Sequence, residues 1–123
     1  MKNSDITQKV ISAAIEVHSK LGPGLLESTY VTCLSHELLK RGISIEKERP
    51  VPLVYKGNHL EHGYRIDILV EEKVVLELKA VEAINEVHRV QILTYMKLVE
   101  FETGLLINFN TIRLVDGLKR FVM

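Results

Sequence analysis

Apolar residues recur every three or four positions near the start of the chain, which predicts an amphipathic helix over residues 5–21. The recurring residues are Ile6, Val10, Ala13, Ala14, Val17 and Leu21. Ser4 or Asp5 is expected to cap the first turn with a side-chain oxygen. Gly22 and Pro23 follow the pattern and are expected to end the helix.

The same spacing occurs twice more and predicts helices over residues 25–41 and 82–100. Gly42 follows the first of these, at a position where glycine commonly ends a helix. The recurring apolar residues are Leu26, Tyr30, Leu34 and Leu38 in one helix and Ile84, Val87, Val90, Leu93 and Leu98 in the other. Such a period is that of a helix whose apolar side faces a core.

Short apolar or alternating runs between the helices predict strands. The predicted strands are residues 43–55, with Pro50 and Pro52 indicating an edge strand or a bulge, residues 63–70, residues 74–80 and residues 103–109. Residues 56–58 predict a turn, and residues 118–122 could add another strand. The order α-α-β-β-β-α-β predicts one compact α/β or α+β domain over residues 1–123.

The strands at 63–70 and 74–80 are expected to form a hairpin with Glu71-Glu72-Lys73 at its tip. Side chains alternate between the two faces of a strand. On one face the expected apolar pairs are Val70 with Val74, Ile68 with Leu76 and Ile66 with Leu78, and Tyr64 continues that face. A shift of one residue would place charges on the buried face, so this register is favoured.

The same register places Asp67 opposite Glu77 on the other face, with Lys79 nearby. Opposed residues have α-carbons about 5 Å apart, and two carboxylates there repel by about 3 kcal/mol at an effective dielectric constant of about 20. Lys79 would offset part of this repulsion. A divalent cation would offset more, because hard cations bind carboxylate oxygens. The alternative is a solvated face with ordinary cross-strand pairs.

Charge is balanced along the chain: the 123 residues include 16 Lys+Arg and 16 Asp+Glu, so the formal net charge is zero. That balance argues against tight, non-specific nucleic-acid binding driven by overall charge. Arg113, Lys119 and Arg120 form a local basic group near the C-terminus. They would either contact phosphates or be solvated.

The single cysteine, Cys33, excludes an internal disulfide and a cysteine zinc site. Because it falls among Val31, Leu34 and Leu38, we expect a buried structural thiol. No apolar run approaches the roughly 20 residues of a membrane span, and the N-terminus has no secretory apolar stretch. We therefore expect a cytoplasmic protein without a membrane partner.

Asp67, nine intervening residues and the triplet Glu77-Leu78-Lys79 resemble the paired motif of the PD-(D/E)xK nuclease superfamily. "GLLESTY" at residues 24–30 fits a Gly-x-x-Glu-x-x-Tyr pattern. With "GYRIDILV", "LELKAVEAINEVHRVQILTYMKL" and "GLLINFN", the chain resembles the small GxxExxY family from about Ile6 to Val122. The resemblance implies a nuclease-like domain with a central mixed sheet of about four strands flanked by helices.

The resemblance also implies a Mg²⁺ or Mn²⁺ site. Asp67 and Glu77 would bind the cation, and the carbonyl of Leu78 could add a ligand. Glu27 would reach the cation directly or through water. Its alternative role is a favourable interaction with the dipole at the start of its helix.

The resemblance assigns Lys79 the task of orienting or activating the attacking water, with neutralisation of Glu77 as the alternative. Gln91 and Tyr95 are four residues apart, and Gln-x-x-x-Tyr resembles a motif that follows the ExK triplet in RecB-type nucleases. Gln91 would support the site, with a purely structural role as its alternative. Tyr30 and Tyr95 would support the site or contact the nucleic acid.

The resulting hypothesis is a metal-dependent nuclease that hydrolyses phosphodiester bonds in DNA or RNA. The alternative is a non-catalytic nucleic-acid- or protein-binding module that retains the fold, which zero net charge and a short chain favour. A different hydrolase ranks last, because the sequence has no Gly-x-Ser-x-Gly elbow. Binding to a duplex by so small a chain would need a homodimer or a partner subunit.

Overall fold

The computed structural model describes residues 2–60 and 63–123. Its elements are α1 (Ser4–Leu21), α2 (Glu27–Lys40), β1 (Ile45–Pro50), β2 (Leu53–Tyr55), β3 (Asn58–Leu60), β4 (Arg65–Val70), β5 (Val74–Lys79), α3 (Glu86–Val99), β6 (Thr103–Asn108), the 3₁₀ helix η1 (Leu114–Gly117) and β7 (Leu118–Val122). The main sheet has the order β1-β4-β5-β6-β7. In it β5 and β6 are parallel, and every other pair of neighbouring strands is antiparallel.

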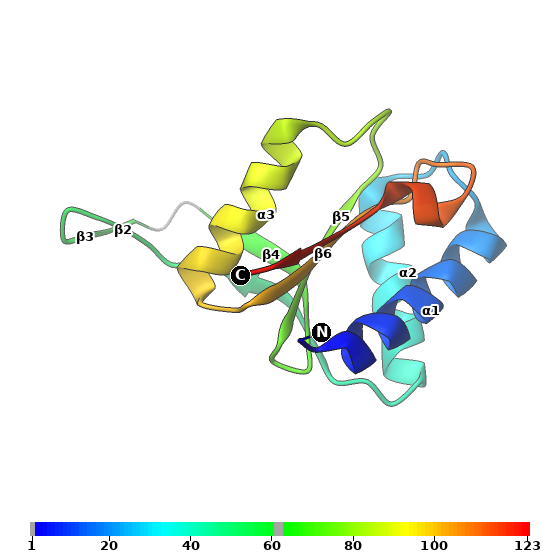
Figure 1. Cartoon of the computed structure of the whole chain (residues 1–123), viewed down its shortest axis with the longest axis horizontal. Helices are drawn as coiled ribbons and strands as arrows, with labels where there is room; N and C mark the ends of the chain where they lie inside the picture. Colours follow the sequence, from blue (N-terminus) through cyan, green and yellow to red (C-terminus); the bar gives the residue numbers. More distant parts are fainter. Residues whose placement is uncertain (1, 61–62) are drawn as a thin grey trace.

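This architecture confirms the predicted α+β class and mixed sheet. In the described part of the chain the sheet has five strands rather than about four, because residues 118–122 do form a strand. Helices cover both faces: α1 and α2 lie on one side and α3 on the other (Figure 1). β5 lies at the centre of the sheet, and its residues from Val74 to Leu78 are all buried.

Two separate cores result from this layering. The core under α1 and α2 includes Val10, Ala14, Tyr30, Leu34, Leu38, Ile68, Leu76, Leu78 and Phe109. The core under α3 is smaller and consists of Val51, Ile66, Leu69, Val75, Ile92, Met96 and Leu106. Burying each large apolar side chain stabilises the fold by about 1.5–3 kcal/mol, so the sheet is held firmly from both sides.

The predicted single strand over residues 43–55 is wrong, because the segment divides into β1 and β2. Pro52 lies at the break and has no N–H to continue a ladder. β1 is an edge strand, as Pro50 indicated. β2 pairs with β3 in a separate hairpin that extends away from the sheet (Figure 1). Its predicted turn is present, with Lys56 and Gly57 both at positive φ.

α3 begins later than predicted, at Glu86 rather than at residue 82. The side chain of Asn85 accepts a hydrogen bond from the N–H of His88, whose ring accepts one from the N–H of Asn85, so the two residues cap the helix. The prediction that Val87 and Val90 face the core is also wrong, because their exposed fractions are 73% and 51%.

Two predictions about the first helices are wrong. Asn3, rather than Ser4 or Asp5, occupies the N-cap position of α1, and it makes no side-chain cap. Cys33 is half-buried rather than buried. Within the described ranges, none of the helices combines the length and apolar character that crossing a membrane requires.

The predicted hairpin register is confirmed for Val70 with Val74 and Ile68 with Leu76, and the tip is at residues 71–73. The predicted pair of Ile66 with Leu78 is wrong, because the β4–β5 ladder ends at Ile68. Ile66 and Ile68 lie in different cores, although residues two apart in a regular strand share a face. The backbone of β4 therefore departs from regular strand geometry at the intervening residue, Asp67.

Candidate metal and catalytic site

Cross-strand pairing is missing on both sides of Asp67. Towards β1, the pairs Lys47–Ile68 and Arg49–Ile66 flank it, but Glu48, which would oppose Asp67, is unpaired. Glu48 has a φ of 55°, a left-handed conformation that L residues rarely adopt. Towards β5, no ladder pair joins Asp67 to Glu77. The sheet is thus opened locally around one acidic residue.

The carboxylates of Asp67 and Glu77 replace the missing ladder. The backbone N–H of Asp67 donates to Oε2 of Glu77 at 2.9 Å. The backbone N–H of Leu78 donates to Oδ2 of Asp67 at 2.8 Å. Each acid therefore accepts a hydrogen bond from the strand opposite its own, which fixes the two carboxylates relative to each other.

Burial makes the charged forms of both acids costly. Glu77 is 3% exposed, and its pKa rises to about 8, chiefly through burial and secondly through the charge of Asp67. Burial likewise raises the pKa of Asp67, and the charge of Glu27 adds to this effect. The hydrogen bond from Leu78 acts against it. A buried acid beside a half-buried one, both with raised pKa values, is typical of a functional site.

Lys79 continues β5 beyond Glu77 and connects it to α3. Its Nζ donates to Oε1 of Gln91 at 2.9 Å, and Nε2 of Gln91 donates to the hydroxyl of Tyr95 at 3.4 Å. Gln91 and Tyr95 lie one helical turn apart. Among the described residues Lys79 makes no ion pair, yet its charge lowers the pKa of both Asp67 and Glu77.

Glu27 is the first residue of α2 and is exposed. It lines a cavity of about 430 Å³ with Asp67. In residues 2–60 and 63–123, no group of three or more His, Cys, Asp or Glu side chains lies close enough to hold a metal ion. The structure therefore brings Asp67 and Glu77 together and leaves Glu27 at the side of the cavity.

Glu48 is an acidic residue near the site that the sequence patterns did not indicate. It lines the same cavity as Glu27 and Asp67, and its charge raises the pKa of Asp67. The only signal for it was the expected bulge near Pro50. The sequence alone does not give the β1–β4 register, so the expected bulge does not show which residue lies next to Asp67.

Tyr30 holds the loop that leads into Glu27. It is fully buried and stacks on Phe109 with ring centroids 4.5 Å apart. Its hydroxyl donates to the carbonyl of Gly22 at 2.6 Å and accepts from the N–H of Leu25 at 3.1 Å. A side chain so enclosed packs inside the fold and is not placed to contact a nucleic acid.

The C-terminal basic residues are partly used inside the fold. Arg120 donates hydrogen bonds to the hydroxyl of Thr7 and to the carbonyl of Lys2. Its guanidinium thereby ties β7 to the start of α1. Two of its five N–H donors are therefore used inside the fold.

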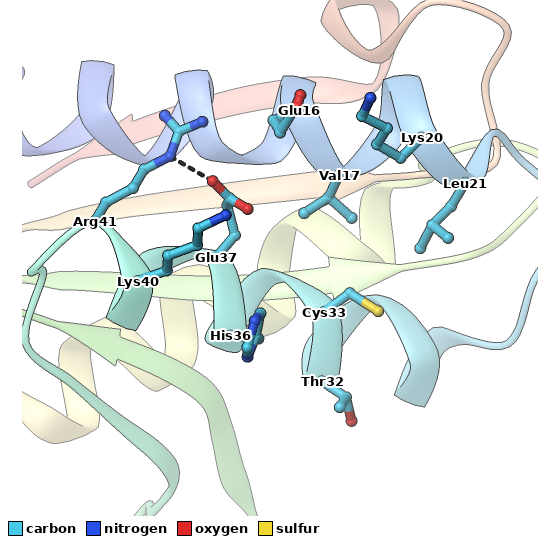
Figure 2. A pocket seen from close by; sticks show the side chains of 10 residues that line it. All are labelled: Glu16, Val17, Lys20, Leu21, Thr32, Cys33, His36, Glu37, Lys40 and Arg41. Atoms are coloured by element: carbon cyan, nitrogen blue, oxygen red, sulfur yellow. Dashed lines mark hydrogen bonds and ion pairs between the residues drawn. The ribbon is translucent and has the colours of Figure 1, made fainter.

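A larger cavity of about 610 Å³ lies between α1 and α2 (Figure 2). Figure 2 shows the ion pair between Arg41 and Glu37, 2.7 Å long, at one end, and the Cys33 side chain further along α2. Asp67, Glu77 and Lys79 are not among its lining residues. We therefore centre the candidate site on the acids and not on this cavity.

The donor chemistry of Asp67 and Glu77 fits a hard divalent cation. One oxygen of each carboxylate accepts a backbone hydrogen bond. The remaining oxygens bond to none of the described residues, and neither is sealed from solvent. Carboxylate oxygens are the ligands that Mg²⁺ and Mn²⁺ prefer. A cation would also offset the cost that burial places on the two charges.

Comparison with known proteins gives one positive result. A family model described as the PD-(D/E)XK nuclease superfamily matches residues 4–121. Comparison with the curated proteins and with the solved structures found no significant match.

Proposed function

Because this chain belongs to the PD-(D/E)XK nuclease superfamily, we propose that it is a metal-dependent nuclease that hydrolyses phosphodiester bonds in DNA or RNA. The observation that carries the proposal is the reciprocal bonding of Asp67 and Glu77 across the opened sheet. Holding one buried and one half-buried acid side by side destabilises the fold, and the arrangement suits the binding of a cation.

Asp67 and Glu77 would hold Mg²⁺ or Mn²⁺ through their remaining oxygens. When bound, such a cation stabilises charge on the phosphate and lowers the pKa of a coordinated water. The two acids would thus fix where the phosphate lies. Glu27, which lines the cavity beside Asp67, would contribute through water and add negative charge near the cation.

Lys79 would act on the attacking water or on a phosphate oxygen. Its Nζ donates to Gln91, and an ammonium carries three donor hydrogens. Two of them are therefore available for water and phosphate. Gln91 would act as a positioning residue, because its amide fixes Lys79 and is itself bonded to Tyr95.

The narrower assignment to the GxxExxY family stays a prediction, and it is supported by Glu27 and Tyr30. Tyr30 holds the loop before α2, and Glu27 is the first residue of that helix. The glutamate and tyrosine of the motif would then act as one unit. The tyrosine would place the helix start that carries the glutamate.

A non-catalytic binding module is the second candidate function. The exposed position of Glu27 and the absence of a three-residue ligand group among the described residues favour it. A protein that has lost the catalytic activity would keep the sheet and the two acids without a complete set of metal ligands.

The test is cleavage of labelled DNA and RNA, single- and double-stranded, with Mg²⁺, with Mn²⁺ and with EDTA. We expect metal-dependent cleavage that Glu77→Gln and Lys79→Met abolish. Matched controls are Glu72→Gln and Lys73→Met at the exposed hairpin tip, which should retain activity. Activity that survives in Glu77→Gln would mean contamination. Absent cleavage together with absent metal binding would favour the module.

A further inference from the structure

A second cavity opens on the α3 side of the candidate site and has a volume of about 490 Å³. Its walls are mainly apolar and include Val51, Leu53, Val90, Leu98 and the rings of Tyr64 and Tyr95. The two rings lie 6.3 Å apart and are inclined by 54°. A mostly apolar cavity of several hundred Å³ with a few polar groups is the usual form of a small-ligand site.

The fold does not require the apolar residues at the mouth of this cavity. Val87 and Val90 lie on the exposed side of α3, with 73% and 51% of their surface exposed. Neither belongs to the core beneath the helix, which Ile92 and Met96 supply. Apolar surface left open next to a cavity is therefore available to a ligand.

The cavity adjoins the candidate catalytic site, since Lys79 and Gln91 line it. Lys79 is its one Lys, Arg, Asp or Glu residue, so the described lining carries no negative charge. The acids lie beyond Lys79, on the opened part of the sheet. A nucleotide whose phosphate lies beside the ammonium of Lys79 would meet no negative charge in the described lining on entering the cavity.

We propose that this cavity binds an unpaired nucleobase of the nucleotide next to the cleaved phosphate, so that the substrate is single-stranded or has an unpaired segment there. The inference rests on the proposed nuclease function and names its substrate class. A nucleobase has apolar faces, which suit the valine, leucine and tyrosine walls, and a polar edge, which suits Gln91 and Thr94. In a duplex the same base is stacked and paired, and cannot enter without leaving the helix.

The balanced charge of the chain supports this assignment. With 16 basic and 16 acidic residues, overall charge does not favour binding through phosphate contacts alone. Contact between bases and aromatic or apolar side chains supplies affinity that does not require net positive charge. An apolar cavity beside a single ammonium provides that combination.

The test is fluorescence anisotropy in EDTA, so that binding is measured without cleavage. The probes are a labelled single strand of about 12 nucleotides, within the range that one small domain covers, the same strand in a duplex, and the strand with abasic sites. The variant is Val87→Ser/Val90→Ser, whose exposed positions leave the core intact. The control is Leu39→Ser, 58% exposed at the far end of α2.

We expect the double variant to weaken single-strand binding by about five- to tenfold or more and to leave duplex and abasic-strand binding unchanged. Leu39→Ser should bind as the wild type does. Equal weakening for single strand and duplex, or no weakening, would overturn the proposal. Absent single-strand binding by the wild type would overturn it as well. So would a double variant whose oligomeric state, measured by light scattering, differs from that of the wild type while its single-strand binding is intact, because the cavity would then bind protein and not a base.

The outcome is separable from that of the proposed function. Selective single-strand binding without metal-dependent cleavage would contradict the nuclease and leave the base site standing. Cleavage that treats single strand and duplex alike, with no effect of Val87→Ser/Val90→Ser, would contradict the base site alone.

Discussion

Asp67 and Glu77 face each other across a gap in the sheet, and the carboxylate of Glu77 accepts the backbone N–H of Asp67 at 2.9 Å. The strands are therefore joined there by an ionisable group in place of a backbone ladder. Stability, metal binding and catalysis are then coupled at this one position.

Stability of the metal-free protein should fall as pH rises from about 5 to about 8. Glu77 has a folded-state pKa of about 8, above its ordinary value of 4.5. Between these values the unfolded chain is ionised while the folded one keeps its proton, so folding binds a proton and stability is lost with rising pH. One pKa unit corresponds to about 1.4 kcal/mol, and the loss should amount to several kcal/mol. Urea unfolding in EDTA at several pH values measures it.

Glu77→Gln is the matched variant for that measurement, because the amide oxygen still accepts the N–H of Asp67 but does not titrate. It should largely remove the decline between pH 5 and pH 8. Glu72→Gln, at the exposed tip, should keep it. A slope that persists undiminished in Glu77→Gln would show that another group dominates.

Metal binding should depend on Asp67 more than on Glu27. Asp67→Asn should weaken Mn²⁺ binding by at least about tenfold, because it removes a half-buried negative charge that the N–H of Leu78 holds in place. Glu27→Gln should weaken it less, since Glu27 is exposed at the side of the cavity. Calorimetric titration at pH 8 measures both. A larger effect of Glu27→Gln would mean that α2 moves towards the acids when metal binds.

Gln91 should affect turnover without affecting metal affinity. Gln91→Leu removes the acceptor that holds Nζ of Lys79 and should lower kcat by about tenfold or more. Gln91→Glu keeps an acceptor and should restore much of the rate. Tyr95→Phe, which loses only the longer 3.4 Å bond, should have a small effect. Equal losses in Gln91→Leu and Gln91→Glu would argue against a positioning role.

Tyr30→Phe should destabilise the protein by about 1 kcal/mol. The variant keeps the stacking on Phe109 but removes the hydroxyl that joins Gly22 to Leu25. Thermal unfolding measures the effect, and Tyr55→Phe, at an exposed tyrosine of the β2–β3 hairpin, is the control. An unchanged melting temperature would mean that water replaces the hydroxyl without loss.

Gly117→Ala should destabilise the protein by about 1–3 kcal/mol. A Cβ at this position would lie 2.3 Å from the backbone carbonyl oxygen of Asn108. The Asn108 side chain holds Val81 in the segment after Lys79 through two hydrogen bonds, so activity should fall as well. Val115→Ala, at an exposed neighbour, is the control. Full stability of Gly117→Ala would contradict the predicted clash.

Much of the fold was accessible from local patterns. The helical period located α1 and α2, and alternation around the Glu71–Lys73 tip gave the β4–β5 register, because a one-residue shift would have buried charge. The closeness of Asp67 and Glu77 followed from that register. The bond between Lys79 and Gln91 did not, because it depends on how α3 crosses the sheet.

The failures have physical causes that lie outside local sequence. Val87 and Val90 fit a helical period but face a cavity, and a pattern cannot distinguish an apolar side that packs from one that binds. Ile66 lies in the other core than predicted because β4 is distorted at Asp67, whereas the alternation of side chains holds only for a regular strand. Glu48 lies near the site because its backbone is left-handed and it is left out of the β1–β4 pairing, and neither feature can be read from the sequence.

The distortion of β1 at Glu48 has a consequence beyond the cavity. An outermost strand with free N–H and C=O groups is a template on which other chains assemble into aggregates. β1 carries four charged residues in succession: Glu46, Lys47, Glu48 and Arg49. Its backbone is irregular at Glu48, where φ is positive, and Pro50 has no N–H to donate. The left-handed conformation at Glu48, which lines the cavity beside Asp67, thus also protects this edge of the sheet from pairing with another chain.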